Sequence, residues 1–460
     1  MTSVWLQDAL AAERETPASE LDGDLRVDVA IVGGGYTGLW AALELKARQP
    51  GLDIAVIERD VCGAGASGAN AGYALPIWMQ VDLLASRSSP EEAIRLCRAG
   101  DAALDEIATF SATHGIDTQI DRRGIIWGAT APMQAGHWHH LLDAAQRHQL
   151  RGHRLLDARE ITAQTGTRAH VAGVLDTSGY LIHPGHLVRG LRRVALERGV
   201  RIFEHTAMTG LLRGRPPGVV TPRGTVTADK VILALYGWSL AVPELRSAIM
   251  VICTDAVMTE PIPERLDRLG WKDTPAIMDS RIFVEAQRQT LDGRVMWTKA
   301  GGRMPFGSRV DASLAAPHKD LQTMRGHLGA IFPELADAPV AGCWSGPIDR
   351  SKTGLPLFGR LPTCPDILYG YGYSGAGVVL SRVGSHILAS LALDAQDAWT
   401  ACPLVRAPDR AFPPEPLRWV GGHMVHAAIA RKDRLDHEGR RSGPVTDFLL
   451  KFKPASYKPT

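Results

Sequence analysis

The sequence predicts an α/β protein in which a discontinuous domain with a parallel sheet is interrupted by a domain with an antiparallel sheet. A strand, turn, helix and second strand follow one another within residues 27–57, and similar strands and helices return at 184–235 and 367–393. Strand–helix–strand units of this kind form parallel sheets. Between 245 and 340 the pattern changes to alternating stretches such as RIFVEAQ and GRVMWTK, which are typical of antiparallel strands.

Length and composition indicate an ordinary globular protein. The chain has 460 residues, 45% of them hydrophobic, which predicts about two or three domains. Its 51 basic and 49 acidic residues nearly cancel, so no general attraction to nucleic acid is expected. Six scattered cysteines without a CxxC pair indicate reduced thiols. The start lacks a signal-peptide pattern and no apolar run could span a bilayer, so we expect a cytoplasmic protein.

A glycine motif follows the first buried strand. The segment GGGYTG supplies Gly33, Gly35 and Gly38 at G-x-G-x-x-G spacing and opens a helix, and Glu58 follows the next strand, twenty residues after Gly38. The first glycine makes the tight turn, the second lets the backbone approach a pyrophosphate, and the third lets helix and strand pack closely. Glu58 can accept both ribose hydroxyls and would repel a 2′-phosphate. The pattern predicts a Rossmann-type dinucleotide site.

The loop after Glu58 favours FAD over NAD as the dinucleotide. It reads RDVCGAGASGANAGYA and consists largely of small residues, which allow a backbone to lie against a large planar ligand. Ser67 and Asn70 add polar contacts. Long loops of this kind in a compact domain are usually functional, although a plain flexible loop is the alternative.

Four ordered stretches resemble the D-amino-acid oxidase/sarcosine oxidase superfamily of FAD-dependent amine oxidoreductases. They are GASGANAG at 65–72, HPGHLVRGLRRVALERGVRIFEHTAMTGL, TADKVILALYGWS, and TGLPLFGRLP followed by YGYSGAGVVLS. The family's usual arginine in the first stretch is Ala69 here, so no role of that arginine transfers. The resemblance implies FAD held without a covalent link by Gly33, Gly35, Tyr36, Thr37, Gly38, Glu58, Arg59, Ala66, Ser67, Asn70, Ala71, Gly72, Met208, Gly237, Gly372, Tyr373, Ser374, Gly375 and Gly377.

The same resemblance implies the domain organisation. We expect a discontinuous FAD-binding domain formed by residues 1–86, 152–243 and 341–398. An inserted antiparallel-sheet substrate domain would comprise 87–151 and 244–340, and a C-terminal extension would follow at 399–460.

Within the superfamily, the likeness is greatest to aminophosphonate oxidoreductases. It rests on TKAGGRMPFG, WSGPIDRSKTGLPLFGRLP and the extension FPPEPLRWVGGHMVHAAIARK. This implies oxidative deamination of 2-aminoethylphosphonate or its N-methyl form, by hydride transfer from the amine-bearing carbon to flavin N5 and hydrolysis of the imine. Two alternatives stay open. One is oxidation of another amine, such as a glutamylated polyamine or an N-methyl or D-amino acid; the other is a flavin-binding redox or partner subunit without turnover.

Residues near the predicted flavin are candidates for contacting the substrate. A phosphonate or carboxylate requires a cation, best a bidentate arginine. Arg350 and Lys352 of the PIDRSK segment are candidates for this cation. Lys299 could instead lie near the flavin and promote reaction with oxygen, and Trp297 could form a wall of the pocket together with Tyr373 and Trp344. The candidate catalytic set is Lys299, Arg303, Arg350, Tyr373 and Trp344.

Other conspicuous residues receive structural interpretations. Cys343 lies near the place where sarcosine oxidase-like relatives bond the flavin, but we expect an inert thiol. The HWHH run at 137–140 lacks an acidic partner, so no metal site is expected. His183 either caps the following helix or touches substrate. The basic tail at 431–458 is expected to be a solvated helix rather than a membrane contact.

Overall fold

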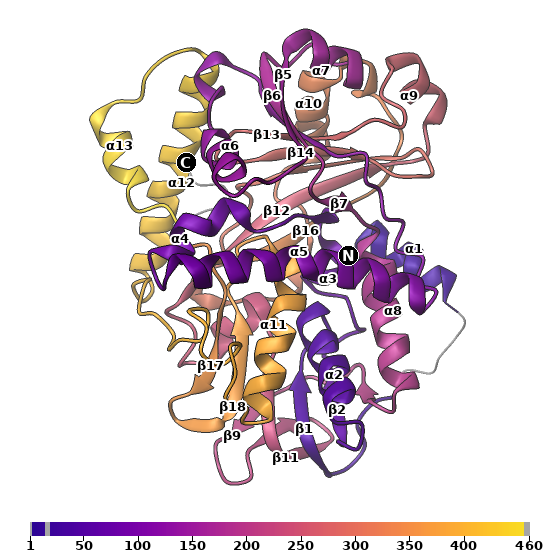
Figure 1. Cartoon of the computed structure of the whole chain (residues 1–460), viewed down its shortest axis with the longest axis vertical. Coiled ribbons are helices and arrows are strands. Elements are labelled where there is room, and N and C mark those ends of the chain that lie inside the picture. Colours follow the sequence, from indigo (N-terminus) through magenta and orange to yellow (C-terminus); the bar gives the residue numbers. More distant parts are fainter. Residues whose placement is uncertain (1, 14–18, 455–460) are drawn as a thin grey trace.

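The computed structural model describes residues 2–13 and 19–454 and contains two eight-stranded sheets and a small sheet of two strands. Figure 1 shows them as two lobes, with the first sheet in the lower lobe and the second in the upper lobe. The two-stranded sheet pairs β3 (Tyr73–Ala74) with β7 (Tyr180–Leu181).

The first sheet has the strand order β17-β18-β11-β1-β2-β8, with β10 and β9 attached to β11. The five strands from β18 to β8 pair in parallel, and β17 pairs antiparallel to β18. The bounds are β1 Leu25–Val32, β2 Ile54–Ile57, β8 Arg201–Phe203, β9 Gly210–Leu212, β10 Gly218–Thr221, β11 Gly224–Leu233, β17 Leu357–Leu361 and β18 Cys364–Tyr371. This confirms the parallel sheet that the sequence predicts.

Helices cover one face of the first sheet. Val29 and Ile31 of β1 share a core with α2 (Tyr36–Arg48), α8 (Pro184–Glu197) and α11 (Gly377–Ala392), whereas Ala30 and Val32 belong to the core of the opposite face. The β-branched apolar run of β1 is therefore buried on both sides, as expected for a parallel strand between two layers.

The second sheet has the order β16-β12-β15-β14-β13-β4-β6-β5 and is antiparallel except for the β13–β4 pair. Its strands are β4 Ile125–Ala129, β5 His153–Asp157, β6 Ala172–Asp176, β12 Ile249–Thr259, β13 Ala276–Asp279, β14 Glu285–Gln289, β15 Val295–Lys299 and β16 Val340–Ser351. Figure 1 places α7 (Ala158–Thr165), α9 (Pro263–Leu269) and α10 (Leu321–Ile331) in this lobe. The antiparallel insertion is confirmed.

The predicted boundaries at 152 and 341 assign β5, β6 and β16 to the FAD-binding domain, but these three strands belong to the second sheet. Residues 152–176 form β5, α7 and β6, which extend the second sheet from β4, and β16 pairs with β12 along nearly its whole length. The reason is hydrogen bonding between distant strands, which short-range patterns do not record. The division into domains stays a proposal, with these three strands assigned to the substrate domain.

The remaining helices join or flank the lobes. Figure 1 shows α5 (Pro90–Thr113) crossing between them and α12 (Leu417–His437) with α13 (Pro444–Leu450) along one side. Asp433 of α12 accepts hydrogen bonds from the backbone N–H groups of Ile282 and Phe283 at 3.0 and 2.9 Å, which ties the extension to the second lobe. The other α-helices are α1 Val4–Ala12, α3 Ala66–Ala69, α4 Val81–Ala85 and α6 His139–Arg147.

Nothing in the described ranges provides a helix with the length and apolar character needed to cross a bilayer. The predicted basic tail is helical in α12 and α13, and its residues 455–458 lie outside the described part of the chain.

Candidate active site

The glycine turn between β1 and α2 leaves no room for side chains. Gly33 has φ +114°, and a Cβ there would lie 2.4 Å from the carbonyl oxygen of Ala234. A Cβ on Gly38 would lie 2.0 Å from the carbonyl oxygen of Gly33, so this helix can approach the turn only without a side chain. Gly35 is the N-cap residue of α2, where backbone N–H groups and the positive end of the helix dipole favour a phosphate.

Glu58 lies at the end of β2 beside this turn. Its carboxylate accepts hydrogen bonds from the backbone N–H groups of Gly34 at 2.7 Å and Asp60 at 3.0 Å. Burial raises the pKa of Glu58 above its usual value, although both hydrogen bonds oppose that shift. Next to it, the Arg59 guanidinium lies 5.0 Å from the ring centroid of Trp238. These side chains form the end of the site where a ribose and a base would lie.

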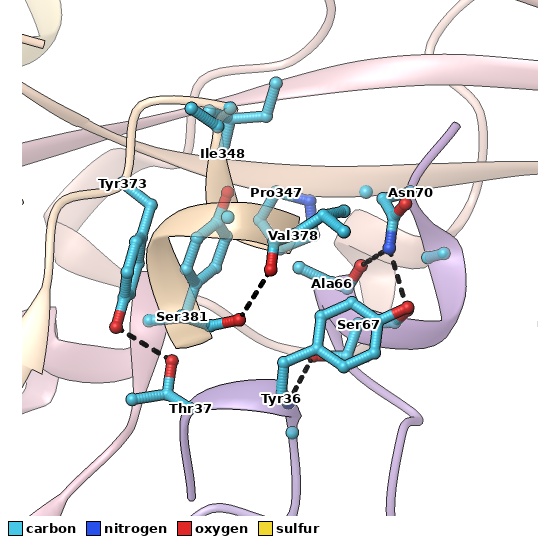
Figure 2. Close-up of a pocket in the computed structure, with 18 of the residues that line it drawn as sticks. Tyr36, Thr37, Ala66, Ser67, Asn70, Pro347, Ile348, Tyr373, Val378 and Ser381 are labelled. Atoms are coloured by element: carbon cyan, nitrogen blue, oxygen red, sulfur yellow. Dashed lines mark hydrogen bonds between the residues drawn. The ribbon is translucent and has the colours of Figure 1, made fainter. Parts of the chain in front are cut away.

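The small-residue loop is held in place by its own polar groups. Asn70 donates to the carbonyl oxygens of Ala66 at 3.2 Å and Ser67 at 2.8 Å, and its own Oδ1 accepts from the N–H of Gly72 at 2.8 Å. The Ser67 hydroxyl accepts from the N–H of Tyr36 at 2.8 Å, which links the loop to the start of α2. Figure 2 shows these residues around the cavity. The sequence predicts a loop here, whereas Ala66–Ala69 form a short helix, α3.

A second helix start meets the first from the far end of the chain. The turn before α11 contains Gly372 at φ +82° and Ser374 at φ +57°. The Thr37 hydroxyl donates to the Tyr373 hydroxyl at 2.8 Å, so the starts of α2 and α11, 336 residues apart in sequence, are directly connected (Figure 2). Both helix N-termini thus point their free N–H groups toward one site.

Asp349 was not among the residues that the sequence indicated. It is fully buried and accepts hydrogen bonds from the backbone N–H groups of Gly372 and Ser374, and burial raises its pKa to about 8. It therefore fixes the turn that leads into α11. Asp349 lies on the same side of β16 as the buried residues Pro347 and Ser351. A charged residue on the buried side of a strand was the feature of the sequence that could have indicated it.

A cavity of about 450 Å³ connects these parts. Fifteen of the predicted cofactor residues line it: Gly33, Gly35, Tyr36, Thr37, Glu58, Arg59, Ala66, Ser67, Asn70, Ala71, Met208, Tyr373, Ser374, Gly375 and Gly377. The other four predicted cofactor residues do not line the cavity: Gly38, Gly72, Gly237 and Gly372. At Gly38 and Gly72 a side chain would collide with neighbouring atoms, so these two positions require glycine for packing.

The substrate side of the cavity is formed by small and apolar side chains of the second sheet. They include Thr254, Ala256, Met278, Ala286, Thr298 and Ala300, with Tyr73 and Leu75, which pack against the second sheet. Among the described residues that line the cavity, Arg59 and Arg350 are the two with cationic side chains. Arg350 donates through Nη1 to the carbonyl oxygen of Ser374 at 3.2 Å, and burial lowers its pKa.

The structure places three of the five candidate catalytic residues away from the cavity lining. Lys299 alternates with Thr298 and Ala300, so its side chain points to the opposite side of β15, where Nζ lies 2.9 Å from the Glu285 carboxylate. Arg303 donates to the carbonyl oxygen of Ser313 at 3.2 Å.

The aromatic candidates divide in the same way. Tyr373 lines the cavity, whereas Trp344 is buried behind it and donates to the carbonyl oxygen of Ala69 at 2.9 Å, which supports the small-residue loop. Trp297 donates to Met324 in the core beneath α10. Cys343 is a free thiol that packs against that same core rather than lining the cavity.

The histidines noted in the sequence have other partners. His183 caps α8 by accepting from the N–H of His186 at 3.1 Å, which favours the capping alternative. His137 contacts the carbonyl oxygen of Ser280 at 3.0 Å. Within the described ranges, no cluster of three His, Cys, Asp or Glu side chains has the arrangement of a metal site.

The residues present fit an FAD molecule. Backbone amides at two helix starts can hold the pyrophosphate and the flavin carbonyls, and Glu58 can hold the ribose. Trp238 lines the cavity, and its buried indole Nε1 makes no hydrogen bond within the described structure. This N–H group could donate to a bound ligand. Together these features define a dinucleotide-dependent oxidoreductase whose cavity has a largely apolar wall.

Comparison with known proteins identifies the family. Residues 28–391 match the family of FAD dependent oxidoreductases known as DAO, and the chain belongs to it. FAD is its cofactor, and it is an FAD-dependent amine or amino-acid oxidoreductase.

Curated relatives and a solved structure agree with this assignment. Gamma-glutamylputrescine oxidoreductase of Escherichia coli is 29% identical over 395 residues, covering 83% of this chain and 87% of the relative. Glycine oxidase of Pseudomonas aeruginosa is 25% identical over 374 residues, covering 79% and 94%. The crystal structure of glycine oxidase from Geobacillus kaustophilus superposes with a TM-score of 0.67 at 21% identity, covering 83% of this chain and 98% of that one.

Proposed function

We propose that this enzyme oxidatively deaminates a small aminophosphonate, 2-aminoethylphosphonate or its N-methyl form. The observation that carries the proposal is Arg350, the one described cation lining the cavity apart from Arg59 at the ribose end. A guanidinium has five N–H donors, and the hydrogen bond to Ser374 uses one of them. The others suit a phosphonate, whose oxygens match the planar fork of arginine.

The chain's own residues prepare the amine rather than exchange protons with it. The lining tyrosines Tyr36, Tyr73, Tyr236 and Tyr373 all have pKa values raised by burial, so they stay protonated at neutral pH. The apolar wall from the second sheet penalises an ammonium ion and favours the neutral amine. FAD would supply the hydride acceptor for this oxidation, and the imine would be hydrolysed by water. Tyr73 and Leu75 line the cavity and would help to orient the bound amine.

A glutamylated polyamine is the second candidate substrate. It is favoured by the uncharged wall of Thr254, Ala256 and Met278, which would accept an extended aliphatic chain, and by the relative named gamma-glutamylputrescine oxidoreductase.

Anaerobic reduction of the purified flavoprotein tests these candidates. We expect 2-aminoethylphosphonate or its N-methyl form to bleach the visible flavin band faster than γ-glutamylputrescine, glycine or sarcosine at equal concentration. Arg350→Gln should weaken apparent binding of the phosphonate by about tenfold to a hundredfold, because it removes a charge-assisted hydrogen bond worth about 1.5–3 kcal/mol. An uncharged alkylamine of the same length should be affected far less.

Arg303→Gln is the matched control, since Arg303 does not line the cavity. Faster bleaching by γ-glutamylputrescine would replace the proposed substrate with the second candidate. An equal loss for charged and uncharged amines in Arg350→Gln would show that Arg350 acts on the turn at Ser374 and not on the substrate.

A further inference from the structure

A second cavity, of about 220 Å³, is lined by residues of α5 and of the strands β4, β5 and β6. Asp101 and Asp105 of α5, His153 of β5 and Asp176 of β6 line it. Leu75 lines both this cavity and the flavin cavity, so the two are neighbours. The reaction at the flavin makes no use of these polar groups.

His153 is a buried side chain without a hydrogen-bond partner. The side chain is 4% exposed, and neither ring nitrogen makes a hydrogen bond within the described structure. Nε2 lies 3.5 Å from Oδ1 of Asp176, which instead accepts from the N–H of Ser178 at 2.9 Å. Buried polar atoms without a hydrogen bond are costly, and an imidazole nitrogen that carries no proton can accept one. The site therefore suits a ligand that brings an N–H donor.

The carboxylates favour a cation in the same place. Asp101 accepts from the indole Nε1 of Trp78 at 2.8 and 3.1 Å, and burial together with the neighbouring Asp105 raises its pKa. Asp105 itself is exposed at the cavity mouth. A positive charge between these side chains would relieve their mutual repulsion. Arg122 and Arg151 also line the cavity, and the Arg122 guanidinium lies 4.7 Å from the ring centroid of Tyr180.

The rest of the wall indicates an organic cation. The indoles of Trp78 and Trp127 line the cavity, and aromatic rings attract ammonium groups through their faces. A metal ion is not favoured, since the described residues contain no group of three metal-ligating side chains suitably placed.

We propose that this second cavity binds a small alkylammonium ion, with its N–H groups donating to His153 and the carboxylates and its carbon atoms packed against the two indoles. This site differs in chemistry from the flavin cavity, because it holds the protonated amine whereas oxidation requires the neutral form. It is independent of which substrate the enzyme oxidises.

Isothermal titration of the full-length, FAD-loaded protein with ethylammonium chloride under anaerobic conditions tests the proposal. We expect saturable binding with a Kd on the order of 1 mM, no change in the flavin absorption spectrum, and no binding of sodium acetate. His153→Phe should weaken binding about tenfold, since it keeps a ring of similar size but removes both acceptors. Asp105→Asn, at an exposed position that should not disturb folding, should weaken it about threefold.

Asp143→Asn is the matched control, because Asp143 is an exposed carboxylate of α6 outside the cavity lining. It should bind ethylammonium as the unaltered protein does. If ethylammonium does not bind, or binds equally to all variants, or perturbs the flavin spectrum as it binds, the second cavity is not the site. If His153→Phe fails to fold, an unchanged affinity in Asp105→Asn overturns the proposal by itself.

Discussion

Replacement of Gly38 by alanine should lower both the stability of the protein and its affinity for FAD, because Gly38 packs against the turn of the glycine motif. Gly38 lies in the first turn of α2, and the new Cβ would stand 2.0 Å from the carbonyl oxygen of Gly33. Cβ atoms essentially never approach other atoms closer than 3.0 Å, so the helix and the turn must separate by about 1.0 Å (3.0 − 2.0 Å). The obstructing atom is backbone, which cannot rotate away as a flexible side chain could.

The expected loss follows from two opposing effects. Alanine is favoured over glycine inside a helix by about 1 kcal/mol. Overpacking of a closely packed site costs about 1–3 kcal/mol, and the rigid contact with Gly33 puts Gly38→Ala near the upper end. We therefore expect a net loss of about 2 kcal/mol in unfolding free energy. Because the same displacement moves the N–H groups that face the pyrophosphate, FAD affinity should fall about tenfold to a hundredfold.

Denaturant unfolding of the apoprotein and fluorescence titration with FAD measure the two effects. Gly326→Ala is the control: it makes the same substitution in α10, where the new Cβ would meet nothing within 4 Å. Gly326→Ala should stabilise by about 0.5–1 kcal/mol and leave FAD affinity unchanged. The reasoning is refuted if Gly38→Ala is as stable as the unaltered protein and binds FAD as tightly.

Two further predictions concern interactions around the cofactor site. Tyr373→Phe should lower stability of the flavin-loaded protein by about 1 kcal/mol, because it removes the acceptor for the Thr37 hydroxyl. Adding Thr37→Val should then cost little more, and additive losses in chemical unfolding would contradict a direct bond. Glu204→Gln should cost about 3 kcal/mol, since Glu204 is buried with Arg189 at 2.7 Å. Burial alone would raise the pKa of Glu204, but its hydrogen bonds and arginine partners lower it. The stabilisation is therefore present above the unfolded pKa and lost as pH falls through the folded value, so unfolding curves of the two proteins should converge in acid and not in base.

Local chain chemistry made the cofactor site predictable. Gly33, Gly35, Gly38 and Glu58 act within one strand–turn–helix–strand unit, where spacing along the chain fixes spacing in space. Most of the predicted cofactor residues accordingly line the cavity. Asp349 was missed because its role is to hold the backbone of a turn 23 residues later; a polar residue at a buried strand position marks it as unusual but does not reveal that partner.

For the wall that the second sheet forms, the sequence indicated the segments but not which side chains face the cavity. Lys299 and Arg350 both lie in strands of the second sheet, yet one faces an ion pair with Glu285 and the other faces the cavity. Successive side chains of a strand alternate between faces, so a choice of face depends on register. The register of β15 is fixed by its pairing with β12 and β14, and Lys299 lies opposite Asp255 and Glu285.

The sequence alone therefore determined the parallel dinucleotide sheet, the glycine turn, the acidic residue after β2 and the glycine-rich start of α11. Each depends on backbone conformations that a few neighbouring residues impose. Only the tertiary structure decided that β5, β6 and β16 join the second sheet, that Arg350 rather than Lys299 or Arg303 borders the cavity, and that a second polar cavity lies beside it. Those outcomes depend on hydrogen bonds and contacts between segments that lie far beyond a few neighbouring residues, such as β12 and β16, and no local pattern contains their free energies.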